Sequence, residues 1–290
     1  MTIFRYCGRD FNEEEMSTIR HLISTHPEAN RAQLSRMVCD NLKWLRPGGG
    51  VKDMSCRVAM LRMQDDGLLN LPAPQRTNGN GKPSRRRTPQ AEPEKDHIVL
   101  SSHELRDIKL DIVDGRKESL LWNEFIDRYH YLRYQPLRGD QIRYIVRAKN
   151  KIVALLGFGA AVWKTAPRDN HIGWTIQQRR DNIHLLINNI RFLILPWVCT
   201  KNLASRILSM TTRRIAVDWE DRYGYRPVLM ETFVESRRFH GTAYKAANWK
   251  YLGETKGRGR LEMEQKALLP LKAIFVYPLV KDYLTHLCSD

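Results

Sequence analysis

The sequence predicts a mixed α/β protein with a small helical domain at residues 1–72 and a larger α/β domain at residues 98–290. Three observations predict this division. Residues 76–95 contain proline, glycine, asparagine and charged residues but no large apolar residue, which is typical of a linker. Apolar residues before this segment repeat at helical spacing, and behind it alternating and helical patterns succeed each other. We therefore expect a basic, flexible linker at residues 73–97.

The front domain is predicted to hold three helices. Asn12 and Glu15 have the spacing of a capping box at the start of the first helix, and Asn30 precedes the second. The third begins near Asp53 and ends before Gly67. Residues 68–71 are interpreted as a short strand.

Three short helices followed by a strand are typical of a winged helix-turn-helix, whose third helix lies in the major groove of DNA. On this interpretation three cations at the third helix would contact DNA: Lys52, Arg57 and Arg62. The alternative is a three-helix protein-interaction module, in which these cations form a solvated face.

Charge favours nucleic acid as the first partner. The chain has 48 Lys and Arg against 32 Asp and Glu, a net charge of +16 that attracts polyanions and releases their counterions. Further phosphate contacts are expected outside the front domain, at Arg85, Arg86, Arg87, Lys256, Arg258 and Arg260.

Other partner classes receive little support. No apolar run approaches 18 residues, and no Lys-rich amphipathic helix stands out, so a membrane is not expected. Residues 1–9 lack the apolar core of a signal peptide, which predicts a cytoplasmic protein. The five cysteines are an odd number without a Cys-x-x-Cys pair, which argues against a zinc finger or a disulfide framework.

Behind the linker the pattern predicts a sheet with interspersed helices. A strand and a helix are followed by a hairpin turning at Lys149 and Asn150, a polar insertion, a long strand, and then alternating helices and strands. The expected strands lie at residues 108–112, 142–147, 152–162, 185–195, 228–234 and 249–254, and the expected helices lie around residues 121–129, 203–208 and 241–247.

This order resembles the GNAT acyltransferase fold, a mixed sheet splayed in its middle where the acyl donor enters. Residues 241–253, GTAYKAANWKYLG, resemble the helix, turn and strand that close GNAT domains, and Tyr244 would match the tyrosine that serves as general acid. The resemblance also implies an acetyl-coenzyme A-like donor, held by an Arg or Gln and two glycines at a helix N-terminus. Here those positions hold Cys199, Asn202 and Ala204, and only Ala204 fits.

Five separated strings together resemble the DruA family of the Druantia anti-phage defence systems, which also occurs with mobile elements. They are RYHYLRY (128–134), LGFGAAVWKTAPRD (156–169), NNIRFLILPWV (188–198), RYGYRPVLMETFV (222–234), and GTAYKAANW with GRGR (241–260). The resemblance implies a defence or mobile-element setting, with other proteins of that system as partners. It implies no particular reaction.

Polar residues inside apolar strands are the candidate catalytic groups. Asn188 and Asn189 are adjacent, so one of them must face the core, either lining the central cleft or satisfying a bulge. Glu231 interrupts the next strand, where a raised pKa would suit a general base, although a lone strand Glu also serves as an ion-pair partner. Tyr244 is the candidate acid.

Three functions follow from these observations. The first is a DNA-binding protein that engages a nucleotide or acyl donor in the cleft, and in its enzymatic form modifies an extruded base. The second is a non-catalytic adaptor that recruits partner proteins to DNA. The third is a metal-dependent nuclease in which His130 and Asp169 converge with Glu231, although no His-x-x-x-His or paired-acid spacing indicates a metal site.

Overall fold

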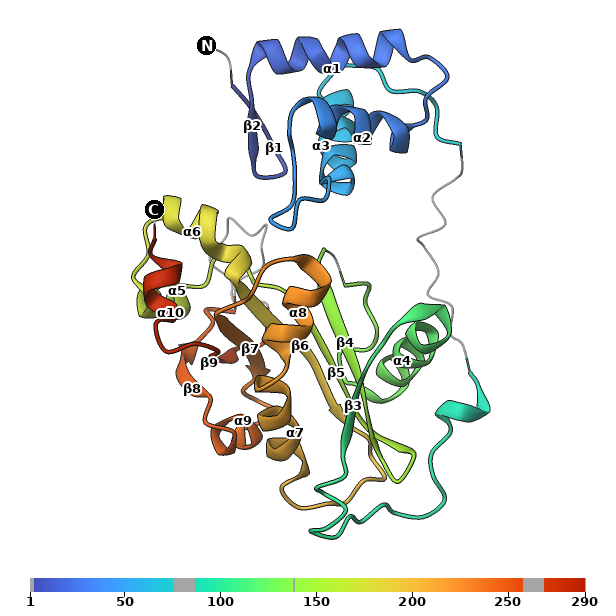
Figure 1. The fold of residues 1–290 in the computed structure, drawn as a ribbon, viewed down its shortest axis with the longest axis vertical. Coiled ribbons are helices and arrows are strands. Elements are labelled where there is room, and N and C mark those ends of the chain that lie inside the picture. The colour runs from blue at the N-terminus through green and yellow to red at the C-terminus, as the bar shows by residue number, and fades with distance from the viewer. Residues whose placement is uncertain (1–2, 76–86, 138, 258–268, 290) are drawn as a thin grey trace. The chain divides into compact units, whose positions relative to one another are not determined.

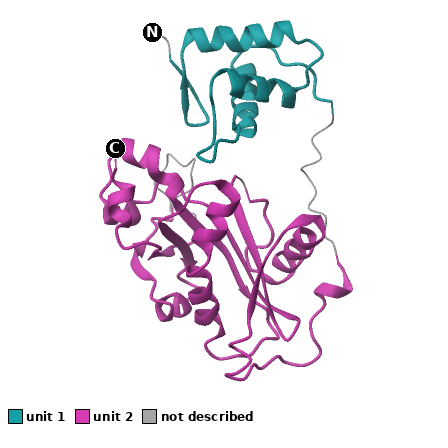
Figure 2. Cartoon of the chain, in the orientation of Figure 1, with its two compact units in different colours: residues 1–84 teal, residues 85–290 magenta. Residues whose placement is uncertain are grey.

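The computed structural model describes residues 3–75, 87–137, 139–257 and 269–289. The chain divides into two compact units, residues 1–84 and residues 85–290 (Figure 2). Each unit has its own apolar core, one built from the helices of the front and the other from the sheet behind it.

The first unit is a hairpin followed by three helices (Figure 1). Both predicted caps at its helix starts are present. The Asn12 side-chain oxygen accepts the Glu15 N–H at 2.8 Å, and Asn30 forms a second capping box with Gln33. Its elements are β1 (Phe4–Tyr6), β2 (Arg9–Phe11), α1 (Glu13–Thr25), α2 (Arg31–Asn41) and α3 (Asp53–Asp65).

The predicted strand at residues 68–71 is wrong, and a winged helix-turn-helix is not confirmed. Residues 68–71 have no strand partner, and Leu69 is instead buried against the helices. The strand pairing of this unit lies before the helices, where Cys7 and Gly8 take the positive φ angles of a tight hairpin turn. A single bridge also joins Leu45 and Val51 between α2 and α3.

The second unit contains a seven-stranded mixed sheet with the order β3-β4-β5-β6-β7-β9-β8. All neighbours are antiparallel except β6 and β7, which run parallel. The strands are β3 (Lys109–Ile112), β4 (Gln141–Ala148), β5 (Lys151–Ala160), β6 (Leu186–Ile194), β7 (Leu229–Glu235), β8 (Lys250–Glu254) and β9 (Lys272–Pro278). The mixed sheet flanked by helices, with its break between two middle strands, confirms the predicted fold class of this domain.

Helices cover both faces of this sheet (Figure 1). On one face Trp122 of α4 lies over Gly157, where a Cβ atom would come within 2.9 Å of the indole. On the other face the Tyr144 hydroxyl donates to Asp218 of α8 at 2.6 Å. The helices are α4 (Gly115–Tyr129), α5 (Ala166–Ile172), α6 (Ile176–Asn182), α7 (Leu203–Thr212), α8 (Ile215–Tyr223), α9 (Thr242–Ala246) and α10 (Tyr283–Leu287), with short 3-10 turns η1 (Pro89–Ala91) and η2 (Ile183–Leu185).

Part of the predicted linker is docked on the second unit. Ala91 is fully buried in the core, and its carbonyl accepts the Tyr129 hydroxyl at 2.7 Å. Thr88 donates its N–H and its hydroxyl to the buried carboxylate of Glu124, at 2.6 and 2.9 Å. Small and polar side chains therefore anchor residues 88–91 through hydrogen bonds, which the search for large apolar residues could not detect.

Several elements were not predicted. The polar insertion after β5 forms α5 and α6, and α8, β9 and α10 were not among the expected elements, although residues 273–277, AIFVY, have the composition of a buried strand. Within the described ranges no helix is long and apolar enough to cross a bilayer.

Candidate functional site: a cleft between two parallel strands

The candidate site is a cleft at the point where β6 and β7 separate. The two strands pair over only four residues, from Leu186 with Leu229 to Asn189 with Thr232. Immediately beyond this point β6 is bulged, because Phe158 pairs with Asn189 while Gly157 pairs with Arg191. A bulge twists and bends its strand, so it favours the divergence. The resulting cleft has a volume of about 600 Å³.

Three hydrogen-bonded side chains form the floor of this cleft. The Tyr244 hydroxyl donates to the Asn189 side-chain oxygen at 2.7 Å, and the Thr232 hydroxyl lies 3.4 Å from the tyrosine oxygen. The Asn189 amide donates to the carbonyls of Gly157 and Arg191, at 3.2 and 3.1 Å. Asn189 therefore bonds to the backbone at the bulge and also orients Tyr244. It fills both roles considered for this position, that of a bulge residue and that of a residue lining the cleft.

Burial restricts what Tyr244 can do. Desolvation raises the pKa of its hydroxyl above the ordinary range of a tyrosine. The hydroxyl stays protonated at neutral pH and its proton is directed at Asn189. It can position a polar group of a ligand, but donating a proton to that ligand requires its bond to Asn189 to break first.

His130 lies on the wall of the cleft at the end of α4. Burial, together with the nearby charge of Arg191, lowers its pKa from 6.5 to about 4. The Leu132 N–H donates to its Nδ1 at 3.2 Å, so the neutral ring carries its proton on Nε2. A neutral imidazole in this position offers a hydrogen-bond donor to a ligand.

Aromatic rings and one guanidinium line the outer part of the cleft. Tyr131 and Phe239 contact each other with ring centroids 5.4 Å apart, and Phe239 is half exposed. The Arg238 guanidinium lies 5.3 Å from the centre of the Tyr131 ring and pairs with Glu235 at 3.0 Å. Such a surface suits a planar ligand that carries a negative charge.

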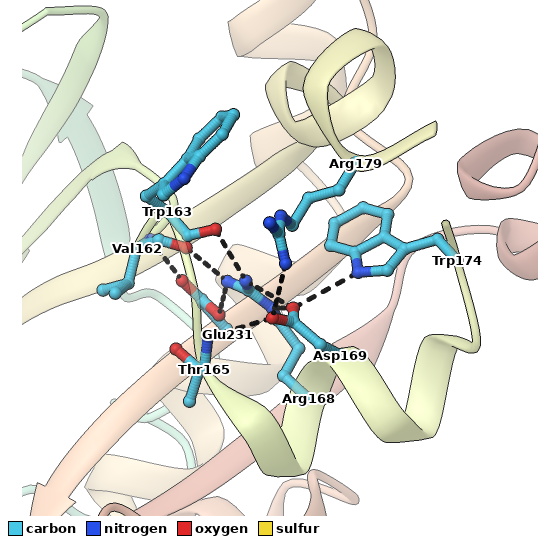
Figure 3. A network of polar contacts seen from close by, with 8 residues as sticks. All are labelled: Val162, Trp163, Thr165, Arg168, Asp169, Trp174, Arg179 and Glu231. Atoms are coloured by element: carbon cyan, nitrogen blue, oxygen red, sulfur yellow. Dashed lines mark hydrogen bonds and ion pairs between the residues drawn. The ribbon is translucent and has the colours of Figure 1, made fainter. Parts of the chain in front are cut away.

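Two other predicted catalytic residues, Glu231 and Asp169, lie outside this cleft in a separate ionic network (Figure 3). Glu231 is fully buried, accepts the Val162 N–H at 2.8 Å and pairs with Arg168 at 2.9 Å. Desolvation raises its pKa, although Arg168 acts in the opposite direction.

Asp169 connects the same network to α6. Its carboxylate pairs with Arg168 at 2.7 Å and with Arg179 at 3.3 Å, and it accepts the Trp174 N–H at 3.3 Å. All the oxygens of Glu231 and Asp169 are therefore engaged by protein groups.

The three residues proposed for a metal site are not brought together. His130 lines the cleft, whereas Asp169 and Glu231 belong to the ionic network. In the part of the chain that the structure describes, no group of three His, Cys, Asp or Glu side chains is arranged to hold a metal ion.

The residues predicted to contact DNA are spread over both units. Lys52 precedes α3 without a side-chain hydrogen bond to its first turn, Arg57 pairs with Asp53 at 3.6 Å, and Arg62 is exposed. Arg87 and Lys256 are exposed in the second unit. The remaining predicted cations, Arg85, Arg86, Arg258 and Arg260, lie outside the described residues.

The loop between β6 and α7 matches the pyrophosphate site of a coenzyme A donor only in part. Cys199, at the position of the Arg or Gln, donates its N–H to the Ile98 carbonyl at 2.9 Å. Ile98 in turn donates to Trp197 at 2.8 Å, so a segment from the start of this unit occupies the side of the loop. Of the two glycine positions, Ala204 fits, whereas Asn202 carries a side chain on a left-handed backbone with φ of 61°.

The sequence reasoning missed Arg168 and the aromatic lining of the cleft. Arg168 lies next to the predicted Asp169, but its main partner Glu231 is 63 positions further along the chain. Phe239 and Arg238 follow β7 in a loop that carries no motif. The sequence signal for this lining is weak, an aromatic residue next to a cation directly after a predicted strand.

Comparisons with known proteins give one family and one group of folds. A family model described as Druantia protein DruA matches residues 62–267. No curated protein sequence matches the chain.

Among solved structures, the chain is similar to a GNAT-family acetyltransferase from Streptococcus pneumoniae, with 12% identity, 59% of this chain and 99% of that chain covered, and a TM-score of 0.37. It is also similar to the Drosophila melanogaster polyamine N-acetyltransferase, with 11% identity, 59% and 100% covered, and a TM-score of 0.35. Likenesses this distant leave the activity of this chain undecided.

Proposed function

The chain belongs to the DruA family, and from this premise we propose that it is a DNA-binding protein of anti-phage defence or of a mobile element. The observation that carries DNA binding is the net charge of +16. Most of the excess of Lys and Arg over Asp and Glu lies in the second unit, so the larger domain contributes most of the attraction for phosphates.

We further propose that the cleft binds a nucleotide, either free or as part of DNA. The cleft volume of about 600 Å³ is in the range of small-molecule sites. Its outer part offers the Tyr131 and Phe239 rings for stacking and the Arg238 guanidinium for a phosphate. Deeper in the cleft, Asn189, Thr232 and Tyr244 offer polar groups that can read the edge of a base.

A non-catalytic adaptor is the second candidate, and one observation favours it. The acidic and phenolic groups expected to do chemistry are bonded to protein partners: Glu231 to Arg168 and Tyr244 to Asn189. An adaptor would use the bound nucleotide to control the recruitment of other defence or mobile-element proteins.

DNA binding is tested by its salt dependence. The full chain is titrated against a fluorescent 20-base-pair duplex at several salt concentrations between 50 and 200 mM. Neutralising about four phosphates gives a slope of log Kd against log salt of about 3.6. A flat response would remove the argument from charge and, with it, the proposal.

Nucleotide binding in the cleft is tested by calorimetry with deoxynucleoside monophosphates and acetyl-coenzyme A. We expect a monophosphate to bind wild type and to lose at least about tenfold in affinity with Phe239→Ala, because stacking on an aromatic side chain contributes about 1–3 kcal/mol. Tyr251→Ala, which removes a comparably exposed ring from β8, serves as the control. Tight binding of acetyl-coenzyme A alone would reinstate the acyl donor.

A further inference from the structure

An exposed tryptophan follows β5 at a distance from the cleft. Trp163 has 49% of its surface exposed, and its neighbours Val162 and Lys164 are also exposed. It is the most exposed tryptophan among the described residues. An indole left in solvent at the end of a buried strand has no role in the core of this unit.

The Trp163 ring is held from inside the protein (Figure 3). The Arg179 guanidinium lies 5.4 Å from the centre of the ring, and Arg179 is itself buried and paired with Asp169. Arg168 holds the backbone of this segment, because its guanidinium donates to the carbonyls of Val162 at 2.6 Å and Trp163 at 3.4 Å. The ring therefore has a buried cation against it, and the backbone that carries it is hydrogen-bonded to the core.

Two exposed cations directly follow this ring and its arginine partner in the sequence: Lys164 comes after Trp163, and Arg180 comes after Arg179 on α6. Lys164 and Arg180 are exposed, and within the described ranges no ion pair engages either of them. The nearest exposed carboxylate on α6, Asp181, accepts the Gln177 side-chain amide at 2.7 Å. Ile176, 65% exposed in the first turn of α6, lies one helical turn from Arg180.

An exposed aromatic ring on a segment that also carries unpaired cations matches the chemistry of single-stranded nucleic acid. Unpaired bases stack on such rings, and the cations follow the phosphates. An apolar protein partner would suit Val162, Trp163 and Ile176, but the two cations would remain without counter-charges. Charge complementarity therefore favours a polyanion.

We infer that Trp163, with Lys164 and Arg180, is a base-stacking platform for single-stranded DNA, distinct from the cleft. The inference rests on the proposed DNA binding and adds to it a preference for unpaired strands at this surface. Asp169 and Arg168 are positioning residues, because they act on the ring through Arg179 and through the backbone of residues 162 and 163.

The test compares single-stranded and duplex DNA of one 20-nucleotide sequence, bound to the full chain at low salt. Trp163→Ala should weaken single-strand binding roughly 5- to 150-fold and change duplex binding less than about twofold. Trp163→Phe should retain part of the affinity, and it remains informative if the alanine variant folds poorly. Tyr251→Ala removes an equally exposed ring and should leave both affinities unchanged.

A second strand containing abasic positions removes the bases while keeping the phosphates. Wild type should bind it more weakly than the intact strand, and this difference should be smaller for Trp163→Ala, because one stacking partner is already missing and only the cleft still reads the bases. If wild type binds duplex DNA and Trp163→Ala binds single strands as well as wild type does, the platform is refuted and the proposed function stands.

Failure of wild type to bind any DNA would overturn both proposals. Unchanged DNA binding by Trp163→Ala, combined with loss of phage protection in cells, would assign this surface to a protein partner instead.

Discussion

Two neighbouring pairs of polar residues on β6 and β7 face opposite sides of the sheet and have different surroundings. Asn188 pairs with Glu231 and Asn189 pairs with Thr232, and neighbours in a strand face opposite sides. On one side the Glu231 carboxylate is sealed from solvent by Arg168. On the other side neutral amide and hydroxyl groups form the floor of an open cleft.

The comparison shows that a polar residue in an apolar strand has two physical uses. A buried charge requires a counter-charge and hydrogen bonds, which consume the atoms that chemistry would need. Neutral groups can be satisfied by one bond each and still contribute to a ligand surface. The oxygens of Glu231 are therefore engaged within its network, whereas Asn189 and Tyr244 lie in the cleft.

The largest expected effect concerns the buried ion pair between Arg168 and Glu231. Arg168→Met leaves the Glu231 carboxylate buried without its counter-charge, and we expect a loss of about 3–5 kcal/mol in the free energy of unfolding, measured by urea titration. Arg180→Met, on the exposed surface of α6, should change it by less than about 0.5 kcal/mol.

Adding Glu231→Gln to Arg168→Met should recover part of the loss, because the uncompensated charge is then absent. Equal stability of Arg168→Met and wild type would mean that the ion pair contributes nothing, and Glu231 would again be a candidate base.

The second largest effect concerns the cleft face of the sheet, where His130 should make the free energy of unfolding depend on pH. The pKa of His130 is lowered from 6.5 to about 4 in the folded state, so the unfolded chain binds a proton more readily. The contribution to stability is present above pH 6.5 and is lost as the pH falls toward 4. Between pH 7 and pH 5 wild type should lose about 1–2 kcal/mol more than His130→Asn, after allowance for partial screening by solvent.

The control for this comparison is His103→Asn, the same substitution at an exposed histidine outside the cleft. Identical acid sensitivity of wild type and His130→Asn would show that the pKa of His130 is the same in the folded and unfolded protein.

The smallest effect concerns the cleft floor. Tyr244→Phe removes one hydroxyl and leaves the Asn189 oxygen without its donor, for a loss of about 1 kcal/mol. Melting curves read the change, and Tyr251→Phe on the exposed strand β8 should melt like wild type. A loss above about 3 kcal/mol would indicate that the hydroxyl organises the bulge itself rather than one bond.

Local patterns predicted most elements of both units. The Asn12 and Asn30 caps lie within a few residues of the groups they bond, and the Lys149–Asn150 turn adopts the positive φ angles that its dipeptide favours. The strand at residues 68–71 was wrong because four residues with no partner strand fold against helices instead.

The candidate site was only partly predictable. Tyr244 and Asn189 were identified, and the structure brings them within hydrogen-bonding distance; their roles stay predictions. The partner of Glu231 could not be read from the sequence, because periodicity shows which residues share a face but not which distant helix covers it. The docked segment around Ala91 was missed for a related reason, since hydrogen bonds to Glu124 and Tyr129 leave no apolar signature.

The order of strands at the edge of the sheet has a consequence for synthesis. β9 (Lys272–Pro278) lies between β7 and β8, so the edge of β7 has no partner until the last of the seven strands is made. A ribosome releases the chain from the N-terminus, and unpaired strand edges are prone to aggregation. A nascent chain that stops short of Lys272 would therefore carry the cleft-forming strand with one side unprotected, and quality-control proteases should remove it.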